Sequence, residues 1–116
     1  VAAGLPALLR AAKLQKRAAR TGFDWPDAEG PRAKIVEELD EVAAAASADV
    51  EEEVGDLLFS VVNYVRHLGI DPEAALRRGN AKFERRFAAM EALAGDRFAN
   101  LDLAAKEALW QQVKRD

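Results

Sequence analysis

Apolar residues recur every three or four positions along almost the whole 116-residue sequence, and this period constrains the fold more than any other feature. Such spacing places the apolar side chains on one face of an α-helix. The pattern predicts five helices, over residues 5–20, 31–46, 49–68, 71–93 and 103–114. No segment shows the strict alternation of a half-buried strand. Long amphipathic helices with short connections predict an all-α bundle, formed by residues 1–116 as a single domain.

The breaks between these helices contain residues that favour helix ends. Gly69 is suited to the position just after the third helix, and Asp71 to capping the fourth. Ser47 or Asp49 can cap the third helix. The longest break, residues 21–31, holds two glycines and two prolines, which predicts a loop of about ten residues.

The apolar faces of the second and third helices are wide. On the third helix we expect the apolar positions to be buried: Val50, Val54, Leu57, Leu58, Val61, Val62, Val65 and Leu68. On the fourth helix we expect Leu76, Phe83, Phe87 and Met90 to point inward. One short chain supplies little cover for so much apolar surface, which is consistent with a homodimer that completes a larger bundle.

The composition excludes several classes of function. The chain has no cysteine, so disulfides, thiolate metal sites and cysteine nucleophiles are excluded, and one histidine is too few for a multi-histidine zinc site. No apolar run approaches the ~18 residues of a membrane span, and the sequence shows no signal-peptide pattern. We therefore expect a cytoplasmic protein with no membrane partner.

Negative charge is concentrated in residues 37–56, "EELDEVAAAASADVEEEVGD", which hold nine of the 20 acidic residues and no Lys or Arg. The rest of the chain carries all 17 Lys and Arg residues. An acidic cluster repels phosphate unless cations lie between them, which argues against nucleic acid as a partner.

The acidic residues recur at helical spacing on two consecutive helices. Glu38 and Glu41 are three positions apart on the second helix, and Glu53 and Asp56 repeat that spacing on the third. A short connection makes the two helices antiparallel neighbours, so the two pairs can face each other. The third helix also carries a polar seam beside its apolar face, formed by Glu53, Asp56, Ser60 and Asn63.

Converging carboxylates repel one another unless a cation lies among them, and Mg²⁺ or Mn²⁺ prefers oxygen ligands of this kind. The pattern alone leaves two interpretations open, a Mg²⁺ or Mn²⁺ site and a structural acidic face. A di-iron site is disfavoured because it requires Glu-x-x-His pairs, and the one histidine, His67, lies three turns away, where a polar helix end is expected.

Basic residues on the fourth helix are suited to phosphate. Lys82 and Arg86 are four positions apart, with Arg85 beside them, although a solvated helix face would look the same. Trp110 and Lys114 share a face of the last helix in the same way. A tryptophan there can anchor packing or stack on a base.

Five blocks of this sequence resemble the catalytic MazG domain of nucleoside triphosphate pyrophosphohydrolases and occur in that family's order over nearly the whole chain. They are "KLQKRAARTGFDWPD", "KIVEELDEV", "EEEVGDLLFSVVNYVRHLG", "NAKFERRF" and "LWQQVKR". The family's E-E-x-x-E and E-x-x-D motifs stand here as Glu37-Glu38-x-x-Glu41 and Glu53-x-x-Asp56. The acidic motifs are shared across the all-α NTP pyrophosphatase superfamily, whereas the five blocks together are specific to MazG.

The resemblance implies a Mg²⁺-dependent enzyme, with Mn²⁺ as the alternative ion. It would cleave an NTP or dNTP between the α- and β-phosphates to give a monophosphate and pyrophosphate, a house-cleaning activity on nucleotide pools. It also implies a MazG-like homodimer around a four-helix core. The implied metal ligands are Glu38, Glu41, Glu53 and Asp56, with Glu37 and Glu52 also in catalytic or nucleotide contacts. The implied nucleotide-binding residues are Lys34, Glu37, Glu38, Glu52, Asp56, Lys82, Arg85, Arg86, Trp110 and Lys114.

Two features depart from the family pattern. Many MazG proteins carry two copies of the domain and one is present here, and the gap between Glu41 and Glu53 is shorter than usual. Two other functions stay open at this level. One is a non-catalytic helical dimerisation or regulatory module, and the other is a narrow-specificity dUTP- or dCTP-cleaving relative.

Overall fold

The structure, a computed structural model, describes residues 1–115 and is all-α, with no strand in that part of the chain. Its helices are α1 (Ala7–Arg20), α2 (Glu29–Ala44), α3 (Val50–His67), α4 (Pro72–Ala94) and α5 (Leu103–Val113). Single 3₁₀ segments precede α3 at Ser47–Asp49 and follow α4 at Gly95–Asn100. The all-α prediction is confirmed, and each predicted helix forms with its ends shifted by a few residues. The chain divides into two compact units, Val1–Ala75 and Leu76–Asp116.

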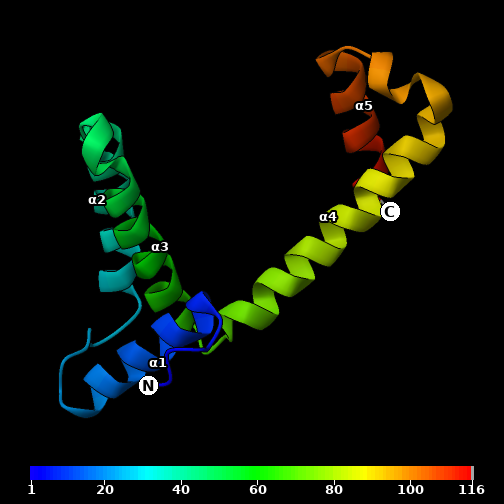
Figure 1. The fold of residues 1–116 in the computed structure, drawn as a ribbon. Coiled ribbons are helices and arrows are strands. Elements are labelled where there is room, and N and C mark those ends of the chain that lie inside the picture. Colours follow the sequence, from blue (N-terminus) through cyan, green and yellow to red (C-terminus); the bar gives the residue numbers. More distant parts are fainter. Residues whose placement is uncertain (116) are drawn as a thin grey trace. The chain divides into compact units, whose positions relative to one another are not determined.

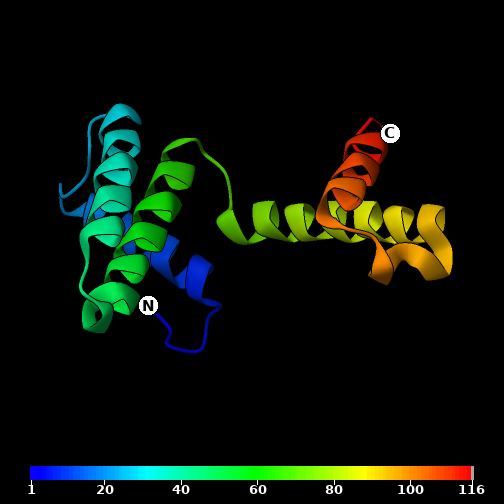
Figure 2. The same ribbon diagram turned by 90° about the horizontal axis from the view of Figure 1, so that it is seen from above.

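The first unit is built on α2 and α3, which run antiparallel and side by side (Figures 1 and 2), with α1 packed against α3. The 3₁₀ segment Ser47–Asp49 makes the connection short, as the sequence predicts. The buried apolar residues of the first unit include Ala12, Pro31 and Val62. This arrangement brings the acidic residues of α2 and α3 to one interface.

Glycines end α1 and α3 in the same way. Gly22 has φ +90° and Gly69 has φ +75°, which favour glycine because a side chain is strained there. After α1 the N–H of Phe23 donates to the carbonyl of Ala18 at 3.1 Å, and the N–H of Gly22 donates to that of Ala19 at 3.0 Å. This pair of bonds is a Schellman motif, and α3 ends with the equivalent pair. At α1 the motif turns the chain so that Phe23 begins the loop to α2.

The burial prediction for α3 is only partly right, and the apolar face of α2 is also partly exposed. Val62 is 2% exposed, but Leu58 is 53% exposed and Leu39, on α2, is 52% exposed. Val50 and Val61 of α3 and Leu68, directly after it, are exposed as well. The helical period identifies the apolar face correctly, but the first unit has too few elements to cover it.

The second unit contains the rest of α4, the 3₁₀ segment and α5. Met90, Ala94 and Val113 are buried, and α5 begins at Asp102, whose Oδ1 accepts a 2.8 Å hydrogen bond from the N–H of Ala105. The prediction that Leu76, Phe83 and Phe87 point inward is wrong for the single chain, in which all three are exposed. Met90 is buried, which confirms the prediction for that residue. None of the helices within residues 1–115 combines the length and apolar character that crossing a membrane requires.

Candidate metal and nucleotide site

Three of the predicted metal ligands meet at the α2–α3 interface. One carboxylate oxygen each from Glu38, Glu53 and Asp56 lies within 4.8 Å of the other two. We call these three residues the acidic triad. Glu53 and Asp56 are adjacent because they are one helical turn apart, and the antiparallel pairing of α2 and α3 adds Glu38 across the interface.

Glu38 is the unusual member of the triad because it is buried. The residue is 7% exposed, and its Oε1 forms an ion pair with Lys34 Nζ at 3.2 Å. Its Oε2 is buried and has no hydrogen-bond partner in the structure. A buried carboxylate oxygen without a donor is costly, whereas an all-oxygen group is the ligand set of a hard divalent cation. The triad therefore fits Mg²⁺ or Mn²⁺ by the chemistry of its donors and by an oxygen that lacks a partner.

The electrostatics of the triad agree with this description. Desolvation, and then the negative charges of Asp56, Glu41 and Glu38, raise the pKa of Glu53 above its ordinary value. Mutual repulsion makes the charged form of Glu53 less favourable, and a cation would reverse the effect. Glu41 is exposed and outside the triad, but its charge acts on Glu53.

Lys34 lies next to the acidic residues of α2. Its Nζ lies 3.2 Å from Glu37 Oε1 and 3.2 Å from Glu38 Oε1, one turn along the same helix. These hydrogen bonds, to Glu37 first and Glu38 second, raise the pKa of Lys34. The acidic segment thus has one cationic neighbour from just outside it. Glu52 lies exposed in the first turn of α3, next to the triad residue Glu53.

The predicted phosphate-binding residues lie in the second unit. Lys82, Arg85 and Arg86 are on α4, and the guanidinium of Arg86 stacks over the ring of Trp110 with 5.6 Å to the centroid. The same ring lies 5.8 Å from that of Phe83. Lys114 follows directly after α5. The structure brings Arg86 and Trp110 together, and their meeting with the acidic triad around one substrate stays a prediction.

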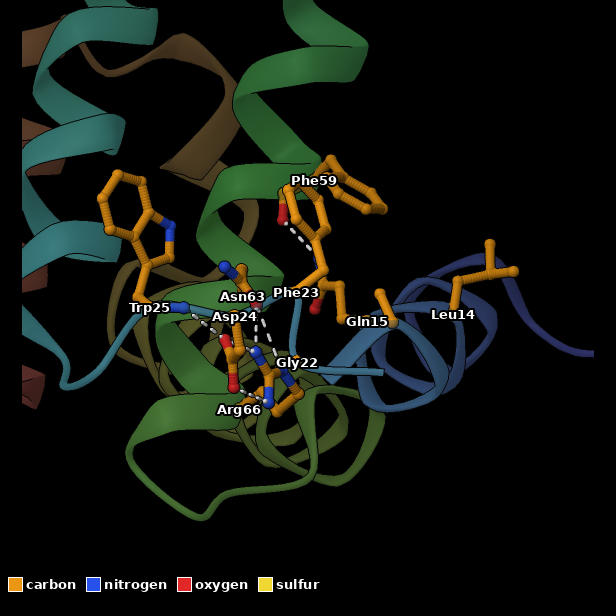
Figure 3. A pocket seen from close by; sticks show the side chains of 10 residues that line it. Leu14, Gln15, Gly22, Phe23, Asp24, Trp25, Phe59, Asn63 and Arg66 are labelled. Carbon is orange, nitrogen blue, oxygen red and sulfur yellow. Dashed lines mark hydrogen bonds and ion pairs between the residues drawn. The ribbon is translucent and has the colours of Figure 1, made fainter. Parts of the chain in front are cut away.

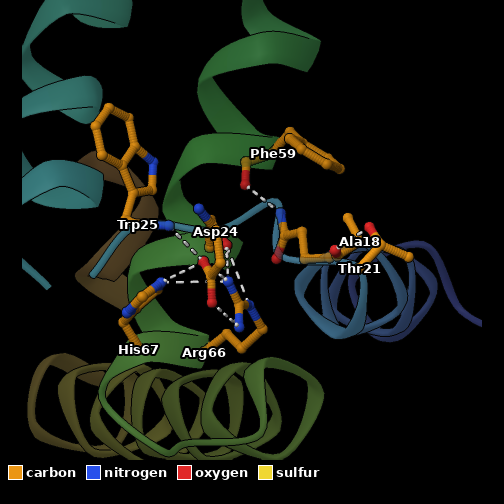
Figure 4. Close-up of polar contacts among 9 residues, drawn as sticks. Ala18, Thr21, Asp24, Trp25, Phe59, Arg66 and His67 are labelled. Atoms are coloured by element: carbon orange, nitrogen blue, oxygen red, sulfur yellow. Dashed lines mark hydrogen bonds and ion pairs between the residues drawn. The ribbon is translucent and has the colours of Figure 1, made fainter. Parts of the chain in front are cut away.

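His67 takes part in a second polar cluster, together with Asp24 and Arg66 (Figure 4). Asp24, in the loop after α1, accepts hydrogen bonds from Arg66 Nη2 at 2.6 Å and Arg66 Nη1 at 3.2 Å. His67 Nε2 lies 2.8 Å from the same carboxylate. The Arg66 hydrogen bonds, joined by that of His67, hold the pKa of Asp24 well below its usual range. The prediction that His67 is a polar helix-end residue is confirmed.

The comparisons with known proteins agree with the motifs. Residues 29–89 match the model of the MazG nucleotide pyrophosphohydrolase domain. The chain is 48% identical over 120 residues to "Nucleoside triphosphate pyrophosphohydrolase" of Escherichia coli (strain K12), covering 96% of this chain and 46% of that protein. It is 44% identical over 114 residues to "Nucleoside triphosphate pyrophosphohydrolase/pyrophosphatase MazG" of Thermotoga maritima, covering 95% and 45% respectively.

A shorter match, 42% identical over 69 residues, covers 57% of this chain and 14% of protein YabN of Bacillus subtilis (strain 168). The chain spans about half the length of the two pyrophosphohydrolases it matches. The domain model covers more than half of the chain and includes all the residues of both acidic motifs. The chain belongs to the MazG nucleotide pyrophosphohydrolase domain family.

Proposed function

We propose that this chain is a Mg²⁺-dependent nucleoside triphosphate pyrophosphohydrolase that cleaves NTPs or dNTPs between the α- and β-phosphates. The buried, unpartnered Oε2 of Glu38 inside the acidic triad is the observation that carries the proposal. The names of the two long relatives support the reaction class. The products would be a nucleoside monophosphate and pyrophosphate.

In this proposal Glu38, Glu53 and Asp56 hold the metal, and Glu41 joins them from the next turn of α2. When bound, Mg²⁺ would neutralise the phosphate charge and lower the pKa of a bound water. Glu37 and Glu52 are nearby acids outside the triad and suit a role in orienting the attacking water or accepting its proton.

The basic residues of the second unit would bind the phosphate chain. Arg85 and Arg86 offer planar guanidinium groups that match phosphate oxygens, and Lys82 adds a point charge. The stacking of Arg86 on Trp110 fixes one guanidinium, because a cation over an indole face is attracted to it. Lys34 and Lys114 are proposed as further nucleotide contacts.

A panel of common NTPs and dNTPs, incubated with the protein and Mg²⁺, tests the reaction directly. We expect pyrophosphate and the monophosphate from several nucleotides, with hydrolysis confined to dUTP or dCTP as the narrow-specificity outcome. Release of orthophosphate and diphosphate nucleosides would contradict the proposal. Glu38→Gln should abolish turnover, whereas Asp40→Asn, an exposed acid of the same helix, should leave it unchanged.

We further propose that residues 1–116 act as one MazG-type domain and that two copies associate. The exposed apolar residues of α2 and α3 support this, since Leu39 and Leu58 are each more than half exposed in the single chain. Sedimentation equilibrium should give twice the chain's 12.7 kDa mass. Leu58→Glu should shift the protein towards monomer, and a wild-type monomer at all concentrations would contradict this part of the proposal.

A further inference from the structure

The charged side chains of α1 are all positive. Residues 1–23 contain five Lys or Arg residues and no Asp or Glu, and all five lie on this helix. Because successive residues of an α-helix are about 100° apart, the five fall within about 120° of the helix circumference and extend over about 15 Å of its axis. We call them the basic face of α1: Arg10, Lys13, Lys16, Arg17 and Arg20.

The basic face lies outside the side of α1 that packs against α3. Ala12 and Gln15 are the buried residues of this helix. The side-chain amide of Gln15 points to α3, where its Nε2 donates to the carbonyl of Phe59 at 3.0 Å (Figure 3). The four basic residues from Lys13 onward are all exposed. The contact with α3 therefore leaves the basic face open.

The basic face has no anionic partner within residues 1–115. The ion pairs in that part of the chain use Lys34, Arg66 and His67 as their cations. Asp24, the first acid after α1, is already bound by Arg66 and His67. Like charges three and four positions apart on one helix repel one another. An anionic partner would remove this repulsion.

Arg10 provides a second, independent observation. Its Nε is buried and has no hydrogen-bond partner in the structure. A buried N–H without an acceptor is unfavourable, and a guanidinium binds a carboxylate through two parallel N–H bonds. Arg10 lies one helical turn before Lys13, at one end of the basic face. A carboxylate that reached this end of the face would supply the missing acceptor.

We infer that the basic face of α1 is a docking surface for an acidic helix of a partner protein. Side chains three and four positions apart have the same spacing on every α-helix, so the acids of a helix laid along α1 would meet Lys13, Lys16 and Arg17 in turn. Arginine is enriched in protein interfaces, and its planar fork binds carboxylates in a fixed direction. The length of the face corresponds to about three turns of the partner helix.

Two other kinds of polyanion suit this surface less well. Nucleic acid would approach the same unit as residues 37–56, whose nine acids repel its phosphates. In addition, Ala7–Arg20 contains no aromatic residue on which a base could stack. A helix that binds an anionic membrane surface also buries an apolar face in it, whereas the inner side of α1 is already packed against α3.

Fluorescence anisotropy of a labelled acidic peptide tests the inference. The aligned peptide is a stapled helix of 14 residues, the length of α1, with glutamates at positions i, i+3, i+4 and i+7. The control peptide has the same composition, with its glutamates spread around the helix. The protein should bind the aligned peptide about five- to tenfold more tightly. Binding should weaken as NaCl is raised, because exposed charges are screened.

Charge reversal locates the peptide on the protein. Lys13→Glu combined with Arg17→Glu should weaken binding of the aligned peptide at least about tenfold, because two attractive pairs become repulsive. Arg10→Met should weaken it about tenfold through the lost hydrogen bond to a charged group. Arg32→Glu combined with Arg97→Glu changes two exposed residues outside α1. This control makes the same change in net charge as the first variant and should alter the affinity less than about twofold.

The alternatives give different results. No binding, equal affinity for the two peptides, or an equal loss in the Lys13→Glu/Arg17→Glu protein and its control would overturn the inference. Tighter binding of a single-stranded oligonucleotide, or of vesicles rich in anionic lipid, would assign the face to that polyanion and also overturn it. So would a wild-type oligomer that dissociates in Lys13→Glu/Arg17→Glu, since a second copy would then be the occupant. Circular dichroism and nucleotide hydrolysis should be unchanged in this variant, because neither residue belongs to the proposed active site.

Discussion

Replacing Glu38 by glutamine separates a metal ligand from an ordinary buried acid. In the metal-free protein Oε2 of Glu38 lacks a partner, and an unsatisfied buried polar atom costs about 1–3 kcal/mol. Glutamine keeps the size, removes one charge, and offers an N–H to the carboxylates within 4.8 Å. The loss of the ion pair with Lys34 offsets part of the stability that the variant gains in this way. We expect the free energy of unfolding to rise by about 1 kcal/mol in the absence of metal.

Divalent cations should reverse which of the two proteins, wild type or Glu38→Gln, has the higher free energy of unfolding. A ligand that binds only the folded state stabilises it by about 2.7 kcal/mol at a concentration of 100 times its Kd. Wild type should gain this amount in Mg²⁺, whereas Glu38→Gln should gain little because a charged ligand is missing. The variant is therefore the more stable protein in EDTA and the less stable one in Mg²⁺.

Urea unfolding followed by far-UV circular dichroism, in EDTA and in saturating Mg²⁺, measures both differences. Asp40→Asn removes an exposed acid from the same helix and should behave as wild type in both solutions. If Glu38→Gln is less stable than wild type by the same amount with and without Mg²⁺, Glu38 is a structural partner of Lys34 and the metal assignment is refuted.

Three further predictions concern the loop after α1 and the second unit. Asp102→Ala removes the cap that accepts from Ala105, so the free energy of unfolding should fall by about 1 kcal/mol in thermal melts. Gly30→Ala places a Cβ against the indole of Trp25, which should swing out and shift its fluorescence emission to the red. Asp24 has a lowered pKa when folded, so its stabilisation is present above the unfolded value of about 3.9 and is lost as pH falls towards the folded value. Asp24→Asn should thus cost about 1 kcal/mol at pH 7 and progressively less below pH 4 in urea unfolding.

Two of these variants have a matched comparison, and the third is tested by its pH dependence. Asp96→Ala removes an exposed acid of the 3₁₀ segment before α5 and should not change the melting temperature. Gly79→Ala adds a Cβ where nothing lies within 4 Å and should leave the emission spectrum unchanged. A stability difference between Asp24→Asn and wild type that does not vary with pH would contradict the ion-pair explanation.

Local sequence was enough to predict the elements and the core of the acidic site. The i,i+3 spacing of Glu53 and Asp56 is a property of one helix, and the short connection to α2 leaves an antiparallel pairing as the simple solution. Glu38 joins them for that reason. Whether Glu41 also points inward depends on the exact rotation of α2, which the spacing does not define.

The contact between α1 and α3 was beyond prediction because the residues that form it are distant in sequence. Gln15 and Phe59 are 44 residues apart, and their hydrogen bond depends on how α1 crosses α3. Asp24 and His67 are 43 residues apart. The sequence therefore predicted that His67 ends a helix, but it did not identify Asp24 as the partner of its side chain. The prediction of which side chains are buried failed for a different reason. Periodicity places Leu58 on the apolar face of α3, but it does not say whether the same chain covers that face.

The loop after α1 separates its attachment from its exposed aromatic side chains. The glycine turn at Gly22 and the ion pairs of Asp24 fasten the loop to the rest of the unit, while Phe23 and Trp25 remain exposed on either side of Asp24. Neither aromatic side chain is part of the glycine turn, the Asp24 ion pairs or the acidic triad. Phe23 and Trp25 are therefore the positions of this loop at which the side chain can be varied while the residues that fasten the loop stay in place.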